Sequence, residues 1–190
     1  MSGQEQVPEE IRFSRNVGGL AEDVHGIVSK FHQQGYPIIN PVLIEFASRL
    51  IEKLDKETLI NGFIKFSHMH WGEIKKRKRE FFLDHARGIF AGLPLNNIDA
   101  FKMLFELKKE DGSHLVCGDD EETLWLYFES LVKVSIKYIH RKRMPKSYKT
   151  ERGVMFEYTR SDFFNDDNIK INLEEHAKIW EIHLDFPETA

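Results

Sequence analysis

The sequence predicts an all-α fold, a single compact domain of about six or seven helices. Apolar residues recur at the three- and four-residue spacing of a helix along most of the chain. Glycine, proline and asparagine break this pattern into segments of ordinary helix length. The 190 residues are enough for one domain with a substantial core, and no internal repeat or low-complexity linker is visible. We therefore expect one helical domain over residues 1–190.

The N-terminal part should hold two helices after a polar arm at residues 1–16. The apolar stripe of the first helix consists of Leu20, Val24, Ile27, Val28 and Phe31. Gly35 and Pro37 end this helix, because glycine takes up the left-handed cap conformation and proline cannot continue a helix. The pair Asn40-Pro41 begins the second helix, since asparagine caps free backbone donors and proline fits a first helical turn.

Three further helices are expected before residue 110. The third begins near Asp55 and runs to Ile74, with Phe66 and His70 in its apolar stripe. The fourth carries Phe81 to Phe90 and ends at a Gly-Leu-Pro sequence. The fifth covers about 97–107.

A long helix is then expected from Asp119 to just before Pro145. The acidic residues 119–122 sit where the positive end of the helix dipole favours negative charge. A polar loop precedes them, with a turn at Asp111-Gly112.

The C-terminal region, residues 146–190, should hold a last helix. Asn172 and Glu175 match a capping box at its start. The segments 153–159 and 168–172 alternate apolar and polar residues, which allows a small β-hairpin near 153–172.

Composition limits the classes of function. The formal net charge is −4 and the isoelectric point is about 6.1, so any anion binding must come from local clusters. A single cysteine, Cys117, cannot form an intramolecular disulfide. The N-terminus lacks signal-peptide character, and no apolar run is long enough to span a membrane. We expect an intracellular, soluble protein.

Two basic clusters are the candidate contact sites. The first is Lys75, Lys76, Arg77, Lys78 and Arg79, and the second is Arg141, Lys142 and Arg143. Five consecutive helical positions sweep about 400°, so the first cluster cannot lie on one face of a helix. Lys78 falls in the apolar seam between Ile74 and Phe81. Either its stem lies along the edge of the core, or the helix breaks there and two helices meet.

Three interpretations of these clusters remain open. They form a solvated surface or one that docks on an acidic partner protein, they are a nuclear targeting signal, or they bind phosphates of nucleic acid. No aromatic residue is interleaved in the first run for base stacking, and no known nucleic-acid-binding signature is present.

No residue is predicted to be catalytic, and we expect no metal site and no cofactor. The usual phosphate-loop, dinucleotide and nucleophile-elbow motifs do not occur. His68 and His70 are two residues apart, which places them on opposite sides of a helix.

Residues 63–94 contain a phenylalanine-rich segment with Ser67-His68 and Trp71, followed by a basic turn, Phe81-Phe82, Ile89-Phe90 and Leu93-Pro94. This segment, together with SIKYIHRKRMPKSY at 135–148, resembles small helical proteins encoded by nucleocytoplasmic large DNA viruses. The shared motifs are packing motifs. The resemblance implies a viral gene product and a virion, such as a minor capsid component, as its setting.

Two functional hypotheses follow. The first is a non-enzymatic structural or interaction protein that contacts other proteins in an assembly, because abundant aromatic residues favour interfaces as well as cores. The second is a nucleic-acid-associated or nuclear-targeted regulatory protein that acts through residues 75–79 and 141–143, and it requires both clusters on one face.

Overall fold

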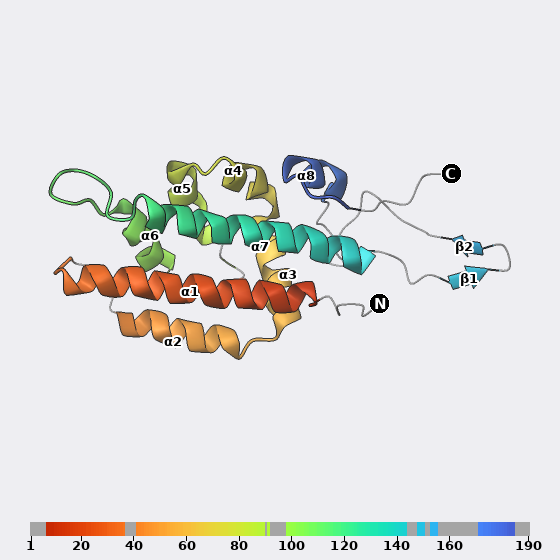
Figure 1. The fold of residues 1–190 in the computed structure, drawn as a ribbon, viewed down its shortest axis with the longest axis horizontal. Coiled ribbons are helices and arrows are strands. Elements are labelled where there is room, and N and C mark those ends of the chain that lie inside the picture. Colours follow the sequence, from red (N-terminus) through yellow and green to blue (C-terminus); the bar gives the residue numbers. More distant parts are fainter. Residues whose placement is uncertain are drawn as a thin grey trace, which may run out of the picture.

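A computed structural model describes residues 7–36, 41–89, 91, 98–143, 148–150, 153–155 and 171–184. The chain is an all-α domain, as the sequence predicts, built around two long antiparallel helices that lie side by side (Figure 1). The described helices are α1 (Glu9–Gln33), α2 (Pro41–Glu52), α3 (Lys56–Ser67), the 3-10 helix η1 (His68–His70), α4 (Trp71–Lys75), α5 (Arg79–Ile89), α6 (Ile98–Glu106), α7 (Asp119–Arg143) and α8 (Leu173–Ile179).

Helix α1 begins earlier than expected. The predicted polar arm of residues 1–16 is too long, because Glu9 already starts the helix and Phe13 is fully buried. Phe13 and Val17 continue the apolar stripe towards the N-terminus at a four-residue spacing. At the other end, Gly35 has a φ of 82°, and the amide of Tyr36 donates to the carbonyl of Phe31, as the predicted left-handed cap requires.

The third predicted helix is interrupted in the structure. Asp55 caps α3 by accepting a hydrogen bond from the backbone N–H of Thr58 at 2.8 Å, but the helix ends at Ser67 and not at Ile74. The 3-10 helix η1 follows, and the buried Trp71 indole donates to the Ser67 hydroxyl at 2.9 Å across it. This buried hydrogen bond holds the tighter turn in place, which the apolar spacing alone does not reveal.

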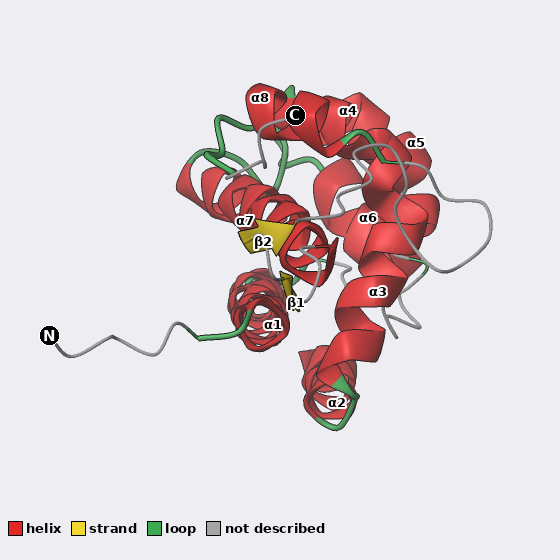
Figure 2. Ribbon diagram, turned by 90° about the vertical axis from the view of Figure 1, so that its right-hand side faces the viewer, coloured by secondary structure: helices red, strands yellow, loops and turns green. Residues whose placement is uncertain are grey.

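Helix α1 contacts both α7 and α3, and these three helices supply many of the buried core residues (Figure 2). The rings of Phe13 on α1 and Phe63 on α3 pack with their centroids 5.3 Å apart. From α7, Leu131 and Ile139 contribute fully buried side chains. Helix α2 packs on α1, and α8 packs on α7.

The loop before α7 has the predicted turn. Gly112 has a φ of 81°, and the side chain of Asp111 accepts a hydrogen bond from the amide of Ser113 at 2.8 Å. An isolated antiparallel bridge joins Lys108 and His114. Leu115 and Val116 are buried, so the loop is anchored to the core before α7 begins at Asp119.

The C-terminal region contains a hairpin with a different pairing from the expected one. Strand β1 (Tyr148–Thr150) pairs with β2 (Gly153–Met155), whereas the sequence suggested 153–159 with 168–172. Residues 156–170 lie outside the described residues, and Ile171 and Asn172 are not in a strand. The Asn172 side chain accepts a hydrogen bond from the Glu175 amide at 3.2 Å and caps α8, as predicted.

Candidate interaction sites

The first basic cluster lies at a break between two helices. Helix α4 ends at Lys75, and α5 begins at Arg79. Arg77 has a φ of 51°, a left-handed conformation that is uncommon for a residue with a side chain. Its amide donates to the carbonyl of Ile74 at 3.0 Å. Of the two alternatives for Lys78, the structure therefore shows the broken helix.

Arg77 is held by two glutamates of α7. Its Nε donates to Glu129 and its Nη1 to Glu122, both at 2.6 Å. Glu129 exposes only 13% of its side chain, so this ion pair is partly shielded from water. The hydrogen bonds to Glu129 and then Glu122 raise the pKa of Arg77 above its ordinary value. The left-handed backbone directs this guanidinium onto α7.

Arg79, the first residue of α5, bonds to α6, to the loop before α7 and to α7 itself. Its guanidinium makes a bidentate contact with Glu121 on α7, with hydrogen bonds of 3.2 and 2.5 Å. It also donates to the carbonyls of Phe105 at 3.0 Å and Val116 at 2.6 Å. The Arg79 side chain is 11% exposed. Nearly all of its donors are therefore used inside the protein, in the fork geometry that carboxylates and carbonyls fit.

Of the three lysines in the first cluster, Lys76 and Lys78 are exposed and Lys75 is half-buried. Lys75 lies over the ring of Trp180, with its Nζ 5.2 Å from the centroid. Lys76 forms an ion pair with Glu73 one turn earlier in the chain. Lys78 is exposed. These lysines, and not the arginines, are the residues of this cluster that could contact a partner.

The second basic cluster lies at the other end of α7. Arg141 forms ion pairs with Glu9 and Glu10 at the start of α1, and Lys142 pairs with Glu57 on α3 at 2.8 Å. Both cations also lie 5.6 Å from the centroid of the Tyr138 ring. Helix α7 continues to Arg143, but the side chain of Arg143 lies outside the described part of the structure.

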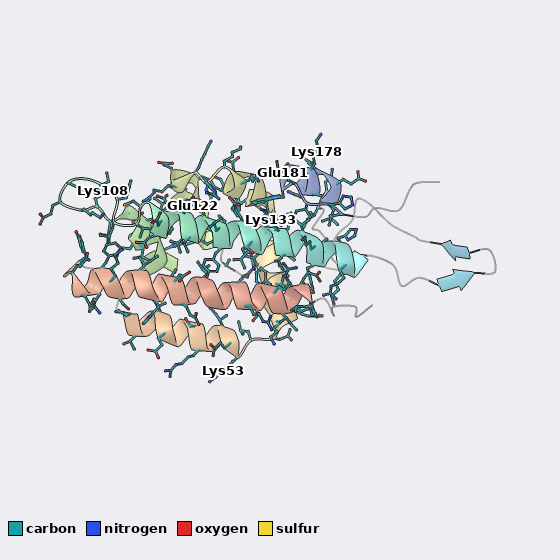
Figure 3. All side chains as sticks on the ribbon, in the orientation of Figure 1. Lys53, Lys108, Glu122, Lys133, Lys178 and Glu181 are labelled. Carbon is teal, nitrogen blue, oxygen red and sulfur yellow. The ribbon has the colours of Figure 1, made fainter. Side chains whose placement is uncertain are left out.

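The structure does not bring the two clusters together. The first contacts α7 between residues 121 and 129, and the second starts at residue 141, so about 18 Å of helix axis separates the nearest contacts. Figure 3 labels Glu122 near the start of α7. Acidic residues of the same chain partly neutralise both clusters, which weighs against the nucleic-acid hypothesis.

Three histidine contacts were not predicted. His70 lies 5.4 Å from Phe81 and 5.1 Å from His85, measured between ring centroids, and His176 lies 5.1 Å from Trp71. Burial, followed by the neighbouring histidines, lowers the pKa of His70. Burial is also the main cause that lowers the pKa of His176. These contacts join residues that no local spacing relates.

The structure also corrects the placement of Phe66. The sequence pattern puts Phe66 in the apolar stripe, but it is 40% exposed, because the buried stripe of α3 runs from Phe63 to Ser67 and leaves Phe66 beside it. Met69 in η1 is 70% exposed. These two residues, which we call the Phe66–Met69 pair, are exposed apolar residues three positions apart in the chain, one at the end of α3 and one in η1. Ser67 takes the buried position although it is polar, so the apolar spacing alone did not reveal it.

Among the described residues, no three histidine, cysteine, aspartate or glutamate side chains are placed to hold a metal ion. None of the described helices combines the length and apolar character needed to cross a membrane. Comparison with protein-family models, with curated proteins and with solved structures gave no match to this chain.

Proposed function

We propose that this chain is a non-enzymatic interaction protein that serves as a structural component of a protein assembly. The observation that carries the proposal is the exposed Phe66–Met69 pair, with 40% and 70% of the two residues accessible to solvent. Phenylalanine and methionine are enriched at protein interfaces, where burial of their apolar surface drives association. The non-enzymatic part rests on the sequence, which contains none of the common catalytic motifs.

The neighbouring structure suits a binding surface that keeps its shape. Trp71, fully buried, follows η1 directly, and its indole bond to Ser67 fixes the turn that presents Met69. Arg77 and Arg79 fasten the next segment to α7 through their glutamate partners. A rigid surface loses little conformational entropy when a partner binds.

The virus particle is the first assembly in which to look for the partner. This part of the proposal rests only on the resemblance of residues 63–94 and 135–148 to helical proteins of large DNA viruses. The exposed pair itself is compatible with any protein partner that offers an apolar surface.

A photo-cross-linking residue in place of Met69 tests the proposal in the cells that produce the protein. We expect one defined protein adduct, and we expect the change Phe66→Ser to abolish it by removing half of the apolar surface. The same cross-linker at Lys53 is the control, because Lys53 lies at the α2 edge of the molecule, away from α4 and α8 (Figure 3). No adduct from position 69, or the same adduct from position 53, would contradict the proposal.

A further inference from the structure

A small pocket lies between the two central helices, away from the Phe66–Met69 pair. Its volume is about 240 Å³, and it is lined by Asp23, Gly26, Ile27, Lys30, Asp120 and Thr123. The first four residues belong to α1 and the last two to α7. Pockets for drug-sized ligands usually have roughly 300–1,000 Å³. This pocket is therefore of a size for a single side chain and not for a whole cofactor.

The pocket has an apolar part. Ile27 is buried, with 7% of its surface exposed, and its side chain belongs to the core. Gly26 is exposed and has no side chain, and nothing lies within 4 Å of the place where a Cβ would be. An aliphatic chain can therefore lie along the helix at Gly26, beside Ile27.

The walls of the pocket carry more negative than positive charge. Lys30 Nζ donates to Asp120 at 3.0 Å, which compensates one of the two carboxylates. The partner of Asp23 is the Tyr127 hydroxyl, a neutral donor that leaves the negative charge in place. Burial, and then the bond to Asp23 and the charges of Asp23 and Glu22, raise the pKa of the Tyr127 hydroxyl. The excess of negative charge favours a cationic guest.

We propose that this pocket receives one lysine or arginine side chain from a partner protein, which rests on the interaction role proposed above. The aliphatic stem of the guest lies along Gly26 and Ile27. Its ammonium or guanidinium group donates to Asp23 and competes with Lys30 for Asp120. The hydroxyl of Thr123 offers a further acceptor. The partner is thus a protein that presents a basic side chain on its surface.

The test uses the full chain labelled with ¹⁵N and the probe N-acetyl-lysinamide, followed by N-acetyl-argininamide. We expect saturable shifts of the Gly26 and Thr123 amide signals, with dissociation constants on the order of millimolar, since one side chain supplies only a few contacts. The neutral probe N-acetyl-glutaminamide should leave these signals unchanged. Ethylammonium, which lacks most of the stem, should bind more weakly than N-acetyl-lysinamide.

Three variants sharpen the result. Asp23→Asn should weaken binding of the lysine probe about tenfold, because it removes a charged acceptor. Lys30→Gln should strengthen binding, because it removes the competing cation, and a purely structural role of Lys30 would not have this effect. Glu52→Gln, an exposed change on α2, is the matched control and should leave the affinity unchanged.

The pocket proposal fails if the Gly26 signal does not shift, if the neutral probe or ethylammonium acts equally well, or if Asp23→Asn has no effect. Such a failure is separable from a failure of the interaction role. If a cross-link still forms from position 69, the interaction role is supported and only the pocket proposal is contradicted. If no cross-link forms from position 69, the interaction role itself is contradicted.

Discussion

The residue that best shows how this chain uses its basic side chains is Arg79. It carries the same charge as its neighbour Lys78, but the two have opposite surroundings. Arg79 is 11% exposed and bonds to Glu121 and to two backbone carbonyls, whereas Lys78 is open to solvent. A guanidinium can satisfy several acceptors at once in a fixed plane, and an ammonium cannot. The charge of Arg79 therefore stabilises contacts within the protein and is not available to a partner.

Replacing Arg79 by glutamine should lower the free energy of unfolding by about 3 kcal/mol, because Glu121 and the carbonyls of Phe105 and Val116 lose their partner. Urea denaturation followed by circular dichroism measures this change. Arg79→Lys should lose less, because it keeps the charge but not the bidentate contact. Lys78→Gln is the control and should change stability by less than about 0.5 kcal/mol. Equal effects of Arg79→Gln and Lys78→Gln would contradict the structural role of Arg79.

At the scale of elements, the sequence predicted those boundaries that depend on neighbouring residues. Gly35 ends α1, Pro41 begins α2 and Asn172 caps α8, because each signal acts within one turn. The sequence failed where a boundary depends on distant contacts. The break after Ser67 is such a case, because Trp71 is buried there and bonds to Ser67. The early start of α1 is different, since Phe13 and Val17 extend its apolar stripe in the sequence and this local signal was missed.

The candidate site was less predictable for the same reason. The basic residues were visible as clusters, but their acidic partners are far away in the chain. Arg77 bonds to a glutamate 52 positions later, and Arg141 to a glutamate 131 positions earlier. The acidic start of α7 can be explained by the helix dipole alone, so nothing local identified Glu121 as a partner of Arg79.

The contacts of η1 and α8 should make stability depend on pH. Both His70 and His176 have lowered pKa values in the folded protein, so the unfolded chain binds more protons near the ordinary histidine pKa of 6.5. Stability should therefore fall as the pH drops below about 6.5. His70 faces His68 and His85, and His176 faces His68 and Glu175, of which only Glu175 favours the protonated form.

Urea midpoints measured at about pH 7.5 and about pH 5.5 give the size of this effect. The variant His176→Gln should show a smaller loss between the two values, because one of the protonating groups is gone. His32→Gln, at an exposed position of α1, should behave like the original protein. A loss of stability that His176→Gln leaves unchanged would show that other groups cause it.

At the scale of the whole molecule, the two basic clusters form ion pairs that connect opposite ends of α7 to other helices. Arg77 and Arg79 fasten the α4–α5 junction to its first half, and Arg141 and Lys142 fasten its last turn to α1 and α3. The chain has a net charge of −4, so its acidic residues are numerous enough to pair with these cations. The two surfaces proposed above for partners do not involve these arginines: one is the apolar Phe66–Met69 pair, and the other is the α1–α7 pocket with its two aspartates.

This arrangement predicts weak binding to nucleic acid. If the three lysines of the first cluster each neutralised one phosphate, the log–log salt slope would be near −2.7, from about −0.9 per phosphate. We expect the protein to show no such slope in a titration of labelled duplex DNA at two salt concentrations. The informative variant replaces Lys75, Lys76 and Lys78 by glutamine and keeps both arginines, since Arg79 and Arg77 hold the fold together. Tight binding that weakens steeply with salt and disappears in this variant would restore the nucleic-acid hypothesis, because it would show that the lysines contact phosphates despite the glutamates beside them.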